Sequence, residues 1–257
     1  MKLLISVDEL QQKFGILPSG ILHVGAHLAE ESQDYERAGW AELNKVIWVE
    51  SQVELAQELI RTLNPVRNKI INATVWSESG KEMIFNVANN SQSSSLLALG
   101  THAKTYPNIK FESNFTIKTK RLDEVITDFD DISFVNLDIQ GAELEALKGL
   151  GLKIYKVKWI YSEVNRKEVY EGCAKIKELD DYLEKFSFDR IATRWAYGAG
   201  WGDALWIKKS ESKGLRKTVI MFKINELQRV VKLAWGLRKH QTKIRMLKTL
   251  KITSTKH

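Results

Sequence analysis

The sequence predicts an α/β protein built on a mostly parallel sheet. Five apolar segments of strand length alternate with longer segments of helical period, and they are ILHVG (21–25), KVIWVE (45–50), KIINATVW (69–76), ISFVNLDI (132–139) and VKWIYSEV (157–164). Strands that alternate with helices form parallel sheets whose two faces are covered. At 257 residues and 44% hydrophobic content, the chain is long enough for one large domain with an appendage.

The connecting segments supply the helices and one insertion. Helices are expected over residues 28–38, 53–63, 142–148 and 173–185. Two later strand segments, FSFDRIAT and DALWIKK, are joined by a connection too short for a parallel crossover, which predicts an antiparallel hairpin at the end of the sheet. Residues 81–120 contain EMIFNV, a serine-rich stretch and FTIKTK, and we interpret them as an inserted hairpin-like element with a loop over one end of the sheet.

Charge divides the chain into two parts. Residues 210–257 carry 13 Lys and Arg and two Glu, whereas the preceding 209 residues carry 26 basic and 30 acidic residues. The single cysteine, Cys173, excludes an intrachain disulfide, and the beginning of the chain lacks the long apolar core of a signal peptide. No apolar run approaches the roughly 20 residues that span a bilayer. We therefore expect a cytoplasmic protein that contacts a membrane at most peripherally.

The ends of the predicted strands carry polar and small residues. The first strand is followed by Gly25 and Ala26, the second ends in Glu50, the fourth in Asp138 and the fifth in Glu163. Each carboxylate alone is explained better by helix capping or turn stabilisation than by a functional site. Ligands of open α/β sheets bind outside the carboxyl ends of the strands, so three carboxylates together favour a site there. Glu50, after the second strand, is placed to accept hydrogen bonds from a ribose diol.

Six motifs in a fixed order make the pattern specific. HVGAHLAEE, VIWVES, SSSLL, RLDEV, VNLDIQGAELEALKG and WGDALWIKK resemble the FkbM-type S-adenosylmethionine-dependent methyltransferases, and LDIQGAELEALKG is the most specific of them. The resemblance runs over roughly residues 18 to 209. It implies a Rossmann-like class I methyltransferase domain over residues 1–209, with 210–257 as a basic helical extension. It also implies S-adenosyl-L-methionine as the cofactor.

The resemblance assigns the cofactor contacts residue by residue. Glu50 would hold the ribose hydroxyls, Asp138 would face the methionine end near the methyl group, and Ser94 or Ser95 would close over the site. The other implied cofactor neighbours are Gly25, Ala26, His27 and Glu30 near the methionine portion and Asn72 and Ala73 near the adenine. The chain departs from the commonest family pattern at His23, His27 and Ala29, where aspartate, asparagine and glycine are frequent. We interpret His23 as a hydrogen-bonded core histidine.

Methyl transfer to a hydroxyl needs in-line alignment, exclusion of water and a base. Asp138 and Glu163 are the candidate catalytic residues, with Asp138 against the cofactor and Glu163 facing the acceptor. Such an acidic pair is also able to hold a divalent cation, but the chain has no HExxH or CxxC spacing and no metal site is predicted.

The acceptor is the least determined part of the prediction. Family members methylate hydroxyls of sugars or polyketide-type natural products, so the resemblance implies a glycan hydroxyl, which is either free or lipid-linked. Trp195, Tyr197 and Trp201 offer flat faces for a sugar and Arg194 a grip for an anionic group, although a tryptophan-rich hairpin tip also packs well on a sheet. An RNA methyltransferase that uses the basic tail is an alternative, disfavoured because the preceding residues are acidic overall and lack an RNA-binding module. A non-catalytic cofactor-binding scaffold is a third reading.

The basic extension has its own pattern. Ile220, Ile224, Leu227, Val231 and Ala234 follow helical spacing, and Val230, Trp235 and Leu237 widen the apolar side. Its cationic residues include Lys223, Arg229, Lys232, Arg238 and Lys239. Such a helix suits an anionic membrane surface. Docking on the rest of the chain or on a partner subunit is an equal alternative, and RNA binding comes third.

Overall fold

A computed structural model describes residues 3–41 and 45–254, with the side chains of the final helix described as far as residue 235. The chain forms two compact units, residues 1–215 and residues 216–257. Each unit is described by itself below.

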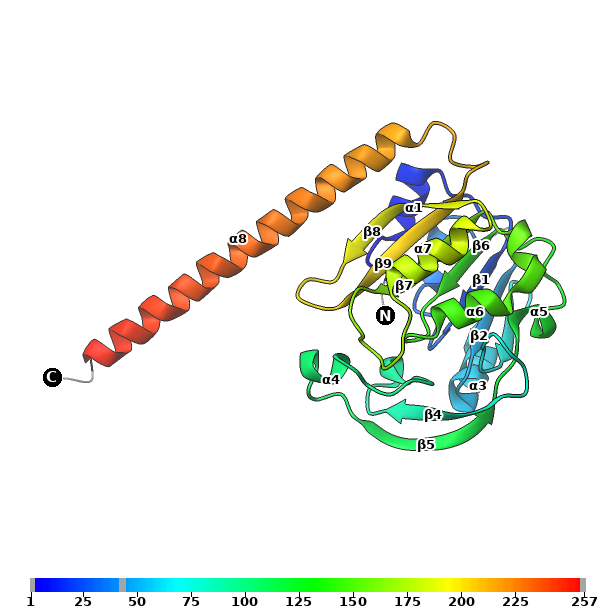
Figure 1. Cartoon of the computed structure of the whole chain (residues 1–257), viewed down its shortest axis with the longest axis horizontal. Coiled ribbons are helices and arrows are strands. Elements are labelled where there is room, and N and C mark those ends of the chain that lie inside the picture. The colour runs from blue at the N-terminus through cyan, green and yellow to red at the C-terminus, as the bar shows by residue number, and fades with distance from the viewer. Residues whose placement is uncertain (1–2, 42–44, 255–257) are drawn as a thin grey trace. The chain divides into compact units, whose positions relative to one another are not determined.

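The first unit is built on a seven-stranded sheet with the order β3-β2-β1-β6-β7-β9-β8 (Figure 1). Its strands are β1 (Ile21–Val24), β2 (Val46–Glu50), β3 (Asn68–Asn72), β6 (Phe134–Leu137), β7 (Trp159–Asn165), β8 (Phe188–Trp195) and β9 (Trp201–Lys208). The first five run parallel, and β9 lies antiparallel between β7 and β8. The predicted mostly parallel sheet with a terminal antiparallel hairpin is therefore confirmed.

Helices precede the first strand and connect the later strands of this sheet. They are α1 (Val7–Phe14), α2 (Ser32–Arg37), α3 (Val53–Thr62), α5 (Leu122–Val125), α6 (Glu143–Gly149) and α7 (Ile176–Glu184), with a 3₁₀ helix η2 over Gly151–Lys156. Helix α2 begins four residues later than predicted because the chain first makes a turn in which His27 and Ala29 have positive φ angles. Helix α1 was not predicted, although Ser6 caps it by accepting the Glu9 N–H at 3.2 Å.

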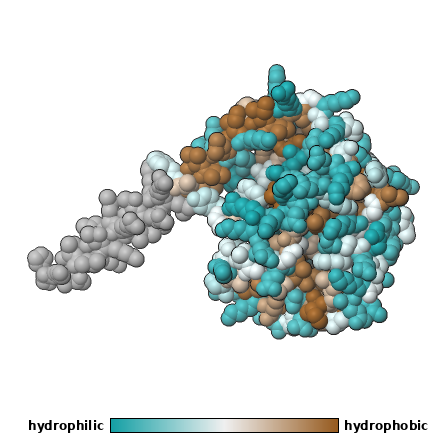
Figure 2. Space-filling model, in the orientation of Figure 1, coloured by the Kyte–Doolittle hydropathy of each residue, from teal (hydrophilic) through white to brown (hydrophobic). Residues whose placement is uncertain are grey.

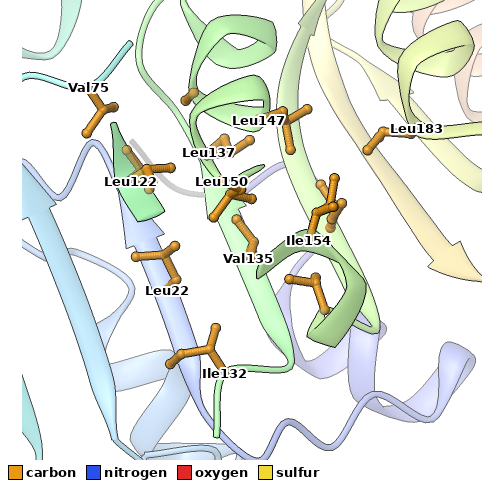
Figure 3. Close-up of a cluster of buried hydrophobic side chains, with 14 of the residues drawn as sticks. Leu22, Val75, Leu122, Ile132, Val135, Leu137, Leu147, Leu150, Ile154 and Leu183 are labelled. Carbon is orange, nitrogen blue, oxygen red and sulfur yellow. The ribbon is translucent and has the colours of Figure 1, made fainter. Parts of the chain in front are cut away.

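The two faces of the sheet are filled differently. On one face, aliphatic residues of β1 and β6 pack against α6, η2 and α7, as Leu22, Val135, Leu147 and Leu183 illustrate in Figure 3. On the other face an aromatic cluster surrounds His23, whose ring stacks on Trp48 at 4.7 Å between centroids. Burial lowers the pKa of His23 to about 3, so the ring is neutral. The interpretation of His23 as a core histidine is confirmed.

The insertion after β3 forms a separate two-stranded antiparallel sheet of β4 (Glu82–Ala88) and β5 (Phe111–Lys118), as predicted. Between these strands lie the 3₁₀ helix η1 (Ser91–Ser93) and the short helix α4 (His102–Thr105). The Ser95 hydroxyl donates to the Gln140 carbonyl oxygen at 2.8 Å, immediately after β6. The insertion therefore reaches the carboxyl ends of the central strands.

The second unit is a single long helix, α8 (Arg216–Ser254). Hydrophobic side chains gather on its described part, beside the grey atoms of Figure 2. The exposed ones are Ile220, Met221, Ile224, Leu227, Val230, Val231, Leu233 and Trp235. The side chains of Leu237, Arg238 and Lys239, which belong to the predicted pattern, lie outside the described residues. Among the described helices, none combines the length and the apolar character that crossing a bilayer requires.

Candidate active site

A cleft opens where the strand order reverses. The chain runs outward from β1 to β3 and returns to β6 on the other side of β1, which is the position where open α/β sheets bind ligands. The cleft encloses about 640 Å³ out to its mouth. Its sheet wall is formed by Gly25, His27, Glu50, Ser51, Gln52, Thr74, Val75, Asp138, Ile139, Gln140 and Ala142, and the insertion contributes Phe85, Ser91, Gln92, Ser94, Ser95 and Leu96.

Gly25 brings the loops after β1 and β6 together. Its φ is +86°, and a Cβ at this position would lie 1.8 Å from the Asp138 carbonyl oxygen. Only glycine permits so close a backbone contact. The resemblance implied that Gly25 lets the backbone approach the cofactor. The structure shows that Gly25 lets the backbone of Asp138, the candidate catalytic aspartate, approach the loop after β1.

His27 and Ala29 adopt left-handed conformations, with φ of 47° and 53°. Asparagine and glycine, the residues frequent at these two family positions, adopt this conformation at least cost. The two departures from the family pattern therefore preserve the turn at the expense of some backbone strain.

The His27 ring links this turn to the insertion. Its Nδ1 lies 2.8 Å from Glu30 Oε1 and its Nε2 lies 2.7 Å from the Ser91 hydroxyl. The Gln92 side-chain amide also donates to Glu30, at 2.8 Å. Glu30 thus holds the insertion against the turn and does not line the cleft, and Ala26 is buried beneath it.

Glu50 presents a buried carboxylate at the end of β2. One oxygen accepts the His27 N–H and the other accepts the Gln52 N–H, both at 2.8 Å. Burial raises the pKa of Glu50, and these backbone donors oppose the rise. Each carboxylate oxygen has a second lone pair, so the group remains able to accept hydrogen bonds from a ligand.

The structure brings different residues to the cleft after β3 than the resemblance implied. The Asn72 side chain donates to the Glu50 and Ser51 carbonyl oxygens at 2.9 and 3.1 Å, and Ala73 packs on the core. Thr74 and Val75 line the cleft instead. The Thr74 hydroxyl is buried and has no hydrogen-bond partner within the described part of the chain, which marks it as a position for a ligand atom.

Gln140 joins the two candidate catalytic carboxylates. Its amide nitrogen lies 2.7 Å from Asp138 Oδ1 and 3.4 Å from Glu163 Oε2, and its amide oxygen accepts the Tyr170 hydroxyl at 2.6 Å. Asp138 lines the cleft, and Glu163 lines a second cavity that Gln140 also lines. Sequence reasoning missed Gln140, although it lies inside the most specific motif and has a positive φ of 55°.

Carboxyl groups crowd around this point. Burial raises the pKa of Asp138, and burial together with the charges of Asp138, Glu143 and Asp203 raises that of Glu163 well above its ordinary value. Burial also raises the pKa of Glu143 and of Asp203 to about 7 each. The cluster therefore retains protons at neutral pH. Within the described residues, no group of three or more His, Cys, Asp and Glu side chains is arranged to hold a metal ion.

The second cavity spans about 590 Å³, counting the open space at its mouth, and the surface that its lining residues expose is mostly apolar. It is lined by Asn90, Gln92, Ser93, His102, Tyr106, Ile109, Gln140, Glu163 and Trp201. Gln92 and Gln140 line both hollows, so the second cavity adjoins the cleft at these two side chains, and Gln140 contacts both carboxylates. His102 was not singled out from the sequence, because a lone histidine in a polar insertion carries no spacing signal.

Only one of the predicted acceptor-binding residues lies in this cavity. Trp201 lines it and its indole N–H donates to the Tyr106 hydroxyl at 3.3 Å. Arg194 instead pairs with Glu9 at 2.7 Å, its guanidinium also donating to the Leu4 carbonyl oxygen. Trp195 lies under the Arg166 guanidinium, 5.0 Å from the ring centroid.

Comparison with known families decides the identity of the fold. Residues 23–190 match the family described as the Methyltransferase FkbM domain. The chain belongs to the FkbM methyltransferase family. Among curated proteins, this FkbM-family chain is similar to the 2-O-methyltransferase NoeI of Sinorhizobium fredii (strain NBRC 101917 / NGR234), with 29% identity over 87 residues. That alignment covers 33% of this chain and 36% of the relative, so it spans about a third of each protein.

Two solved structures are similar to the chain at lower sequence identity. The FkbM-family chain is similar to methyltransferase FkbM of Methylobacillus flagellatus KT, with a TM-score of 0.49 and 14% identity over 79% of this chain and 47% of that one. It is also similar to a SAM-dependent methyltransferase of Aquifex aeolicus, with a TM-score of 0.42 and 12% identity over 78% and 88% of the two chains.

Proposed function

We propose that this FkbM-family methyltransferase uses S-adenosylmethionine to methylate a hydroxyl group of a sugar or glycan. The proposal rests above all on one observation: Gln140 stands between a cleft that contains Glu50 and Asp138 and a cavity that contains Glu163. Two adjoining hollows that meet at a pair of carboxylates suit a reaction with two substrates and one proton to move.

The cleft has the chemistry to hold the cofactor. Glu50 retains free lone pairs for the ribose hydroxyls, and the unpartnered Thr74 hydroxyl is available to the adenine or ribose. Ser94 and Ser95 come from the insertion and cover the opposite wall. S-adenosylmethionine, when bound, supplies an electrophilic methyl group. The protein's own residues then have to orient the acceptor oxygen toward it and exclude water.

Glu163 is the group that takes up the hydroxyl proton in this proposal. It faces the second cavity, and its raised pKa makes its ionised form a stronger base than an ordinary carboxylate. Gln140 donates toward both Glu163 and Asp138, and so holds the two side chains in one arrangement. Because the base must be ionised, methyl transfer is expected to rise with pH as the pH approaches the raised pKa of Glu163.

Two observations support a sugar hydroxyl as the acceptor. The curated relative NoeI is named a 2-O-methyltransferase, which denotes transfer to oxygen. The second cavity combines aromatic side chains with amides and a hydroxyl, the mixture that fixes the orientation of small polar ligands.

The test is mass spectrometry of candidate glycans after incubation with the full chain and S-adenosylmethionine. A gain of about 14 Da on a glycan, abolished by Glu163→Gln, is the expected result. Methylation of RNA and not of glycans would contradict the acceptor, and absence of S-adenosylhomocysteine binding in calorimetry would contradict the cofactor.

We also propose that α8 contacts anionic membranes and thereby places the enzyme near lipid-linked acceptors. Its exposed aliphatic residues and Trp235 accompany Lys223 and Lys232 on the same helix. Salt-sensitive sedimentation with phosphatidylserine vesicles, absent with phosphatidylcholine and weakened in the double variant Lys223→Glu and Lys232→Glu, is the expected result. Equal sedimentation of the wild type and the double variant would refute membrane contact through α8. Binding to RNA and not to vesicles would assign the basic residues to nucleic-acid binding.

A further inference from the structure

The second cavity lacks positive charge. Among the described residues that line it there is no lysine or arginine. Its polar groups are the amides of Asn90, Gln92 and Gln140, the Ser93 and Tyr106 hydroxyls, the Trp201 indole N–H, the His102 imidazole and the Glu163 carboxyl. An anionic ligand would therefore meet no counter-ion there. It would also approach the crowded carboxyl groups beside Gln140, which disfavour further negative charge.

Among the described residues that line this cavity, His102 is the buried polar group whose side chain has no hydrogen-bond partner. The residue is only 7% exposed, and neither ring nitrogen has a hydrogen-bond partner within the described part of the chain. Its ring lies 4.9 Å from the Tyr106 ring and 5.3 Å from the Tyr170 ring, measured between centroids, so aromatic packing fixes its position. Burial lowers the pKa of His102, so the ring is neutral and offers one donor and one acceptor nitrogen.

Groups of this kind match a polyhydroxylated ring. A sugar hydroxyl both donates and accepts, so it is able to pair with either nitrogen of a neutral imidazole. The amide side chains offer the same two functions to neighbouring hydroxyls, and Trp201 with Tyr106 adds aromatic surface for the apolar face of the ring. Tyr170 connects this wall to the carboxylates, because its hydroxyl donates to Gln140.

We infer that the second cavity is the acceptor site, that it selects an uncharged polyhydroxylated ring over an anionic one, and that His102 binds one of the ring hydroxyls. This inference rests on the proposed methyltransferase function and adds the charge class of the acceptor and the residue that positions it. His102 acts by holding the acceptor, whereas Glu163 handles the proton.

Matched acceptors test the charge class. Methyl glucoside, methyl galactoside and methyl mannoside are each compared with their uronic-acid counterpart, using the full chain, S-adenosylmethionine and release of S-adenosylhomocysteine as the readout. At least one neutral glycoside should be methylated at least about 10-fold faster than its uronide, and Ile109→Arg should narrow that ratio by adding a cation to the cavity wall. A preferred uronide, or no methylation of any neutral glycoside, overturns the inference. Calorimetry with S-adenosylhomocysteine distinguishes failure of this inference from failure of the proposed function. If S-adenosylhomocysteine does not bind, the proposed function is refuted.

Variants of His102 test its role. His102→Phe keeps an aromatic ring between Tyr106 and Tyr170 and removes both nitrogens, so KM for the neutral glycoside should rise about 10-fold while the Kd of S-adenosylhomocysteine stays within about twofold. His102→Gln retains a donor and an acceptor and should recover part of the loss. An unchanged KM in His102→Phe overturns the assignment. The assignment is also overturned if His102→Phe loses affinity for cofactor and acceptor equally, or if KM of His102→Gln is no lower than that of His102→Phe. Either result would indicate that His102 has a structural role.

Discussion

Replacement of Glu50 by glutamine is the sharpest test of the cofactor cleft. The wild-type carboxylate uses one oxygen for the His27 N–H and the other for the Gln52 N–H, each at 2.8 Å. An amide has only one oxygen, so its NH₂ group faces one of these two backbone donors, and the charge available to ribose hydroxyls is lost. Loss of a hydrogen bond to a charged group costs about 1.5 to 3 kcal/mol, which corresponds to an affinity loss of roughly 10- to 100-fold.

Stability should change much less than affinity. The lost backbone hydrogen bond destabilises the turn, but burial already disfavours the Glu50 charge, as its raised pKa indicates, and the amide removes that penalty. These two contributions have opposite signs, so we expect Tm to shift by no more than about 3 °C. Affinity of the wild type should also fall as the pH is lowered through the raised pKa of Glu50, and the glutamine variant should lack this dependence.

The assay is calorimetric titration with S-adenosylhomocysteine, paired with thermal unfolding. Glu54→Gln provides the matched control, because Glu54 is exposed on the helix that follows and should change neither quantity. If Glu50→Gln binds as tightly as the wild type, Glu50 does not hold the ribose and the reasoning about this cleft is wrong.

Three further changes probe the same region. Gly25→Ala should prevent folding or lower stability by several kcal/mol, since its Cβ would lie 1.8 Å from the Asp138 carbonyl oxygen, whereas Gly39→Ala, which has a similar φ and open space, should cost only about 1 kcal/mol in denaturant unfolding; equal costs would contradict the clash. Asp138→Asn and Glu163→Gln should each slow methyl transfer by about 10² or more without lowering Tm at pH 8, because each removes a buried charge; full activity of Glu163→Gln would eliminate Glu163 as the base. Burial raises the pKa of Asp203 from 3.8 to about 7, so between these pH values the folded state binds a proton that the unfolded state has lost. The free energy of unfolding therefore falls as the pH rises from 3.8 to about 7, by roughly 4 kcal/mol in total. Asp203→Asn, whose oxygen still accepts the Leu4 N–H, should unfold at a higher temperature than wild type at pH 8 but not at pH 4, and parallel pH profiles would disprove this account.

Periodicity and motif order were sufficient for the sheet. Apolar runs such as VIWVE read as buried strands because both faces of a parallel sheet are covered, and the short link before β9 predicted its antiparallel direction. The turn at His27 and Ala29 was missed, since histidine adopts a positive φ only in a minority of cases, although more often than most residues, and alanine does so rarely. Helix α1 was also missed, although Ser6 and Gly15 are ordinary capping residues, because its eight residues contain only three buried apolar positions, Val7, Leu10 and Phe14.

Local sequence rules were weaker for the site. Strand ends located Glu50, Asp138 and Glu163 at one edge of the sheet, because parallel strands deliver their carboxyl ends together. His102 and Thr74 were not identifiable from the sequence. What distinguishes them is a buried polar side chain without a hydrogen-bond partner among the described residues, and hydrogen-bond partners are known only once distant segments are folded together. For the same reason Thr74 lines the cleft where Asn72 and Ala73 were expected, because the direction of a side chain after a strand depends on where the backbone turns.

The insertion contributes walls to both hollows, with Ser94 and Ser95 in the cleft and His102 and Tyr106 in the second cavity. If one ligand orders this segment on binding, the second ligand binds with a smaller loss of conformational entropy. The two ligands should therefore bind with positive cooperativity. Thermodynamic linkage then requires reciprocity: the factor by which acceptor tightens cofactor binding equals the factor by which cofactor tightens acceptor binding. The supply of acceptor would thereby set how firmly the enzyme holds its methyl donor, and a scarce acceptor would leave the donor free for other enzymes.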